Sequence, residues 1–112
     1  MKISYDGLFD KCATFMCGDV EENTPVKVSE NCTVAAAASG EEFCGVVVGV
    51  RNGMCAVKMN GAVTLGYTGS APALGFTQLS ADGNGGVTAA SSGIMRLVVE
   101  VDEQAATVTF IM

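Results

Sequence analysis

The chain has 112 residues, 12 Asp and Glu against 6 Lys and Arg, and a net charge of −6, with 49% hydrophobic and only 16% charged residues. A folded domain of this length buries a core without metal or disulfide bonds, so we expect one domain over residues 1–112. The scarce, scattered cations exclude a nucleic-acid partner, and the absence of histidine removes the usual general base and metal ligand.

Residues 1–10 precede the first predicted strand and carry four large apolar side chains, Ile3, Tyr5, Leu8 and Phe9. We expect this segment to be either an arm that becomes ordered on a neighbouring molecule or an extra edge strand of the domain. Met1-Lys2 leads directly into polar sequence, which is unlike a signal peptide. The five cysteines are an odd number without a C-x-x-C pair, so free thiols in a reducing compartment are expected.

Short β-branched runs between turn residues recur roughly every 8 to 12 residues, the spacing of β-sandwiches and barrels. No segment keeps a 3.6-residue period over a helical length. The fold class is therefore predicted to be all-β, a compact barrel-like sandwich of about ten short strands. The predicted strands are 11–16, 26–28, 33–36, 43–50, 54–59, 62–65, 76–79, 87–89, 95–101 and 107–112.

Two Asn-Gly pairs, Asn52-Gly53 and Asn60-Gly61, supply the positive φ angles of type I′ turns. We expect each pair to close a hairpin, so that the strands on either side of it pair antiparallel. Strands 43–50 and 95–101 are apolar at nearly every position, which predicts central strands covered on both faces. Their apolar runs are far shorter than the roughly 20 residues of a membrane span, so no membrane partner is expected.

The sequence also repeats itself, because residues 28–57 can be laid over residues 79–108. Val47, Val48 and Val50 then fall on the run Val98, Val99 and Val101. The alignment breaks only at the Gly-rich turn 82–86 and at Glu41-Glu42, which are expected loops where insertions are tolerated. We therefore expect an internal duplication, with two pseudo-symmetric halves, 11–59 and 62–112, that share one core.

For each candidate catalytic residue, a structural role explains the sequence better than a catalytic role does. The acidic residues Asp19, Glu21 and Glu22 lack the ligand spacing of a calcium loop and are expected in a solvated loop. Lys58, in Ala56-Val57-Lys58-Met59, resembles the biotin-bearing lysine of biotinyl domains, but it lies inside a predicted strand and is expected to face solvent. We expect no enzyme activity, catalytic residue, metal or cofactor.

A thiol function for Cys12 and Cys17 is also weak. The two are five residues apart, and only Lys11 would supply the positive charge that lowers a thiol pKa. Structural thiols are expected instead, most of them acting as small core side chains.

One further pattern consists of turn and core residues spread along the chain. They are the strings Gly18-Asp19-Val20, Thr24-Pro25-Val26-Lys27-Val28-Ser29, Phe43-Cys44-Gly45-Val46-Val47, Val50-Arg51-Asn52-Gly53, Val57, Gly61, Tyr67-Thr68-Gly69, Ala71-Pro72-Ala73-Leu74-Gly75, Asp82-Gly83, Gly85-Gly86-Val87 and Leu97-Val98-Val99-Glu100-Val101-Asp102. In these strings, over nearly its whole length, the chain resembles the small capsid decoration proteins of tailed bacteriophages.

This resemblance implies a non-enzymatic structural protein that binds the outside of the expanded head and stabilises it. The implied partners are the major capsid protein and further copies of the chain, most often in a trimer, and the implied locations are the bacterial cytoplasm during assembly and then the virion surface. Ile3, Tyr5, Leu8 and Phe9 become candidate contacts with the shell or a neighbouring subunit. The alternative is a glycan- or receptor-binding β module on a phage fibre or cell surface.

Overall fold

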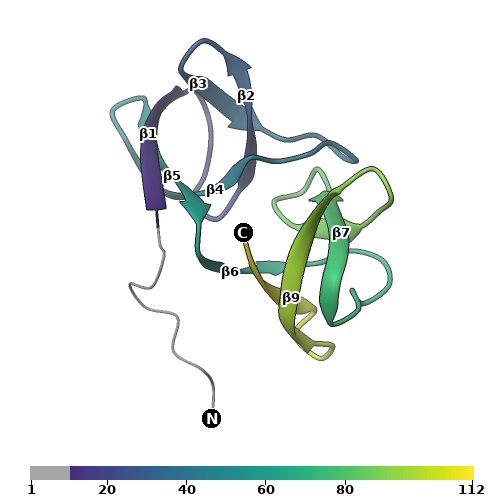
Figure 1. Cartoon of the computed structure of the whole chain (residues 1–112). Coiled ribbons are helices and arrows are strands. Elements are labelled where there is room, and N and C mark those ends of the chain that lie inside the picture. The colour runs from purple at the N-terminus through teal and green to yellow at the C-terminus, as the bar shows by residue number, and fades with distance from the viewer. Residues whose placement is uncertain (1–10) are drawn as a thin grey trace.

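The computed structural model describes residues 11–112, which form ten strands in two sheets and no helix (Figure 1). The first sheet contains β1 (Lys11–Cys17), β2 (Pro25–Glu30), β3 (Thr33–Ala36), β4 (Gly45–Arg51) and β5 (Met54–Asn60). The second contains β6 (Ala62–Gly66), β7 (Gly75–Ala81), β8 (Val87–Ala89), β9 (Ile94–Asp102) and β10 (Thr107–Ile111). The all-β prediction is confirmed, and each of the ten predicted strands has a counterpart.

The first sheet is a closed barrel in the order β1-β3-β2-β4-β5. β1 runs antiparallel to β5 over most of its length, with Phe15 opposite Cys55. At its far end it also pairs parallel with β3, through Met16 with Thr33 and Cys17 with Val34. This short parallel seam closes the barrel, so the sheet has no fully open edge.

The second sheet pairs in the corresponding order, β6-β10-β9-β7-β8, but closes less completely. A single parallel bridge, Tyr67 with Val87, lies where the barrel has its β1–β3 seam. Both central strands carry a β-bulge, at Val48 in β4 and at Val99 in β9. The two sheets thus match in size and pairing order, while their origin by duplication stays a prediction.

One of the two predicted hairpins forms. Asn52 and Gly53 have φ angles of 52° and 76°, as a type I′ turn requires, and β4 pairs antiparallel with β5. The prediction for Asn60-Gly61 is wrong, because β5 pairs with β1 and β4 while β6 pairs with β10. Both edges of β5 are already occupied, so the chain crosses from the barrel to the second sheet at this point.

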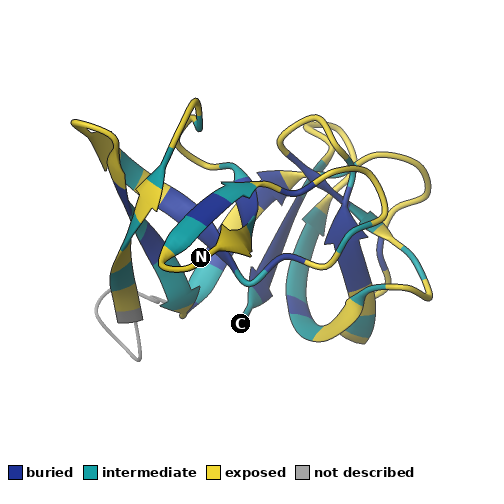
Figure 2. Cartoon of the chain, turned by 90° about the horizontal axis from the view of Figure 1, so that it is seen from above, coloured by how far each residue is buried: buried dark blue, intermediate teal, exposed yellow. Residues whose placement is uncertain are grey.

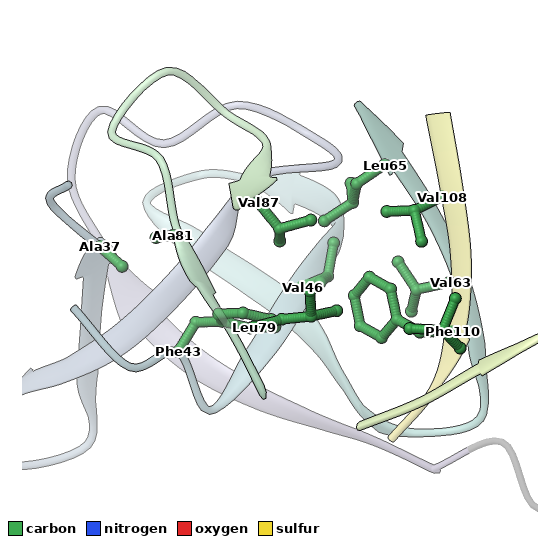
Figure 3. Packing of buried hydrophobic residues seen from close by; sticks show 11 residues of the cluster. Ala37, Phe43, Val46, Val63, Leu65, Leu79, Ala81, Val87, Val108 and Phe110 are labelled. Carbon is green, nitrogen blue, oxygen red and sulfur yellow. The ribbon is translucent and has the colours of Figure 1, made fainter. Parts of the chain in front are cut away.

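The buried side chains form two clusters. The smaller one fills the barrel and consists of Val26, Val34, Val47, Cys55 and Val57. The larger one fills the second sheet but includes three side chains from the first half, Ala37, Phe43 and Val46 (Figure 3). The Phe43 and Phe110 rings meet edge to face, with their centroids 6.0 Å apart. The incompletely closed second sheet is therefore filled partly by the barrel half.

The expectation that β4 and β9 are covered on both faces is wrong for parts of both strands. Val46 and Val47 are buried, but Val48 and Val50 further along β4 are 42% and 39% exposed. Met95 at the start of β9 is 56% exposed. The bulge after Val47 shifts the register of β4 against β5. Figure 2 shows that several strands are buried over only part of their length.

The segment 37–44, between β3 and β4, ties the two sheets together. Gly40 N–H donates to the Ala81 carbonyl at 2.8 Å, and Ala81 N–H donates back to Glu41 at 2.9 Å. The Arg96 guanidinium donates to the Phe43 carbonyl at 2.8 Å and lies 4.8 Å from the centre of its ring. The predicted insertion Glu41-Glu42 thus falls in the segment that contacts the second half.

Candidate interaction surfaces

The described residues 11–112 contain no group of three or more His, Cys, Asp or Glu side chains that could hold a metal ion. Asp19, Glu21 and Glu22 are exposed in the connection between β1 and β2, as expected of a solvated loop. The candidate contact residues Ile3, Tyr5, Leu8 and Phe9 lie outside the described residues. Within the described part, no helix is long and apolar enough to cross a membrane.

Lys58 lies inside strand β5, as expected, and is half-buried, so its side chain faces solvent only in part. Its ammonium group donates to the Ala62 carbonyl at 3.2 Å, across the connection to the second sheet. Since Asn60-Gly61 closes no hairpin, Lys58 does not stand at the tip of a β-turn as a carrier lysine would.

The structure separates Cys12 from Cys17. Cys12 is exposed and lies opposite Lys58, whereas Cys17 is half-buried and packs against the barrel cluster. Burial, together with a hydrogen bond to Cys17, raises the pKa of the Cys55 thiol to about 11. Burial also raises the pKa of the half-buried Cys44. Both groups therefore stay protonated near neutral pH. The expectation that most of the cysteines act as core side chains is wrong, because only Cys55 is buried while Cys12 and Cys32 are exposed.

One hollow lies on the barrel, where β1, β5 and β4 run beside one another. Its volume is about 540 Å³, and its lining is mostly apolar. Small residues face one another across the strands, with Ala56 opposite both Thr14 and Gly49, and a Cβ added at Gly49 would meet open space. Met54 and Val50, which are 48% and 39% exposed, provide most of the larger apolar side chains around it.

A second apolar surface lies on β7 and β9 of the other half. Phe76 and the preceding Leu74 are 72% and 68% exposed, which makes them the most exposed large apolar side chains in the described chain. Phe76 is opposite Leu97, and Gln78 is opposite Met95, so these four side chains share one face of the sheet. We give the name Phe76 patch to the three apolar side chains of this face, Phe76, Met95 and Leu97, together with Leu74, which precedes the strand.

A smaller hollow of about 220 Å³ lies between the two halves. Val28 from the barrel and Ile94 from the second sheet both line it, beside Cys44. At its edge, Lys27 donates to a Glu41 carboxylate oxygen at 2.7 Å, and this hydrogen bond lowers the pKa of Glu41. The half-exposed ion pair fixes the edge of the junction and adds little to stability.

No protein-family model and no curated protein matches this chain. The features of the chain that point to a function are therefore its sequence resemblance and its two apolar surfaces. The sequence did not predict either surface, because an apolar residue in a strand gives the same sequence pattern whether or not a neighbouring layer covers it. Gln78 lies two residues after Phe76 and therefore on the same face of the strand, and this polar residue was the one signal that the face points away from the core.

Proposed function

We propose that this chain is a structural protein of a tailed bacteriophage, a capsid decoration protein that binds the outside of the expanded head and stabilises it. Its partners are the major capsid protein and other copies of the chain, with a trimer as the favoured oligomer. It is not an enzyme, needs no cofactor, and passes from the bacterial cytoplasm to the virion surface during assembly.

The exposed apolar side chains are the observation that carries this proposal. A soluble monomer rarely leaves a contiguous group of large apolar side chains uncovered, and such groups commonly mark protein interfaces. Three of the four residues of the Phe76 patch lie on the paired strands β7 and β9, and its exposed side chains, Leu74, Phe76 and Met95, are suited to packing against another protein. The sequence resemblance names the class of partner.

The architecture and charge support the same function. Strand pairing, two cores and the interlocking segment 37–44 give a fixed body, as a protein that bridges neighbouring shell subunits needs. A net charge of −6 would keep such a body from competing with the shell for DNA.

Co-sedimentation tests the proposal. The purified chain is mixed with expanded heads assembled from the major capsid protein encoded beside it, and bound copies per head are counted over a concentration series. Saturation at a fixed ratio to capsid subunits is expected. The absence of binding at micromolar concentration would refute decoration.

A glycan- or receptor-binding module is the outcome that such a refutation would favour. Phe76 is the single exposed aromatic side chain among residues 11–112, since Phe43 and Phe110 are buried and Phe15 and Tyr67 are half-buried. Sugar sites usually offer several exposed aromatic rings, so this alternative has less support. A glycan array run beside the co-sedimentation separates the two functions.

A further inference from the structure

The seam that closes the barrel is short and ends at a cysteine. β1 pairs with β3 only through Met16 and Cys17, while its contact with β5 extends from Lys11 to Met16. Cys17 N–H donates to the Gly53 carbonyl at 2.9 Å, so Cys17 is held between β3 and the β4–β5 turn. Cys17 therefore lies at the end of β1 where the barrel closes, with β3 on one side and the β4–β5 turn on the other.

A second thiol lies next to Cys17 inside the barrel. Phe15 is opposite Cys55, and Cys17 is two residues further along β1, so it lies diagonally across the strand pair from Cys55 on the same face. Both cysteines belong to the barrel interior, Cys55 as a buried member of its cluster and Cys17 packed against that cluster. The Cys17 thiol also contributes to the raised pKa of the Cys55 thiol, as expected of neighbouring groups.

We propose that Cys17 and Cys55 form a disulfide bond when the folded chain meets a low-molecular-weight disulfide, and that this bond ties β1 to β5 at the end of β1 where the barrel closes. The Cys17 thiolate attacks the small disulfide and releases one small thiol, which leaves a mixed disulfide on Cys17. The Cys55 thiolate then attacks the Cys17 sulfur and releases the second small thiol. Two protein thiols are oxidised and one small disulfide is reduced to two thiols.

Accessibility sets this order of attack. Cys17 is half-buried and Cys55 is only 2% exposed, so an external disulfide reaches Cys17 first. Cys55 acts within the protein, and its pKa of about 11 keeps little of it as thiolate at neutral pH. The second step should therefore become up to about tenfold faster for each unit by which the pH rises toward that pKa.

The test uses the full chain with Cys12→Ser, Cys32→Ser and Cys44→Ala, so that only the proposed pair remains. The reduced protein is treated with oxidised glutathione, alkylated under denaturing conditions, and digested with trypsin. Cleavage after Lys11, Lys27, Arg51 and Lys58 places Cys17 in peptide 12–27 and Cys55 in peptide 52–58. The matched control adds Cys17→Ser, which leaves the buried Cys55 in place.

We expect both thiols to disappear, peptides 12–27 and 52–58 to become joined, and the melting temperature to rise by roughly 10 °C, reversibly with a reductant. The control should keep its Cys55 thiol and its original melting temperature. A stable glutathione adduct on Cys17, or bonds between chains, would overturn the proposal. The same oxidation of the wild-type chain is a second test, and a disulfide bond between Cys17 and Cys32 there would also overturn the proposal.

Discussion

At the scale of single residues, Phe43 contributes most to the junction of the two halves. Its ring is buried in the second core against Phe110, its carbonyl accepts from Arg96, and the guanidinium lies over its face. Phe43→Ala should lower the free energy of unfolding by about 3–5 kcal/mol, because it leaves a cavity and removes the surface beneath Arg96. Chemical denaturation measures this.

The matched control for Phe43 is Phe76→Ala, which removes the same ring from a position that is 72% exposed. Its effect on the free energy of unfolding should stay within about 0.5 kcal/mol. Equal losses for the two variants would show that Phe43 does not join the halves as described.

Asp82 is the carboxylate most involved in the fold. It accepts hydrogen bonds from Thr68 Oγ1 at 2.6 Å and from the Asn84 and Gly86 N–H groups at 2.7 and 3.0 Å. Burial alone would raise the pKa of Asp82, but these hydrogen bonds together outweigh it and hold the pKa below its usual value. The carboxylate thus fixes the Gly-rich turn 82–86 to the end of β6, beside the Tyr67–Val87 bridge.

A pKa that is lower in the folded chain means that Asp82 stabilises the fold above its unfolded pKa, and that this contribution is lost as the pH falls through the folded value. Asp82→Asn should cost about 1 kcal/mol at pH 7, a figure discounted for partial exposure. The variant should also lose less stability than the wild type on acidification below about pH 4. Parallel stability curves from pH 7 to the acid range would contradict this role.

At the scale of elements, the sequence was sufficient to predict where strands form but not which strands pair. The Asn-Gly signal is local, so it predicted the Asn52-Gly53 hairpin correctly and failed at Asn60-Gly61, where β1 and β4 already occupy both edges of β5. The apolar runs of β4 and β9 likewise predicted strands, while their uneven burial depends on neighbours distant in sequence. In β7, Phe76 is exposed and Leu79 is buried, and the polar Gln78 on the face of Phe76 was the only local sign of this difference.

The connection between β8 and β9 allows a test of close packing. A Cβ placed on Gly93 would lie 2.3 Å from backbone atoms of Leu79, nearer than real contacts allow. Gly93→Ala should therefore force β9 away from β7 and lower the free energy of unfolding by about 3 kcal/mol or more. Gly49→Ala in β4 is the control, because its added Cβ meets open space. A Gly93→Ala variant as stable as the Gly49→Ala variant would refute this tight approach.

At the scale of the whole molecule, the two apolar surfaces lie on different halves, the hollow on the barrel and the Phe76 patch on the second sheet. A decoration protein needs one surface for the shell and, if it forms an oligomer, another for its own copies. The Phe76 patch holds the most exposed large side chains, and aromatic side chains often carry a large share of interface energy. If the proposed function is right, this patch is our candidate for the shell-binding face.

Phe76→Asp should therefore weaken binding to expanded heads by at least about tenfold, because a charge would be buried where an apolar ring was expected. It should leave the fold unchanged, since the side chain is exposed, and far-UV circular dichroism checks this. Val50→Asp, at the barrel hollow, is the matched variant and should bind heads like the wild type. The reverse result, with Val50→Asp defective and Phe76→Asp normal, would assign shell binding to the barrel instead. If both variants bind normally while the wild type saturates the heads, decoration would stand, and the shell contact would lie outside these two positions.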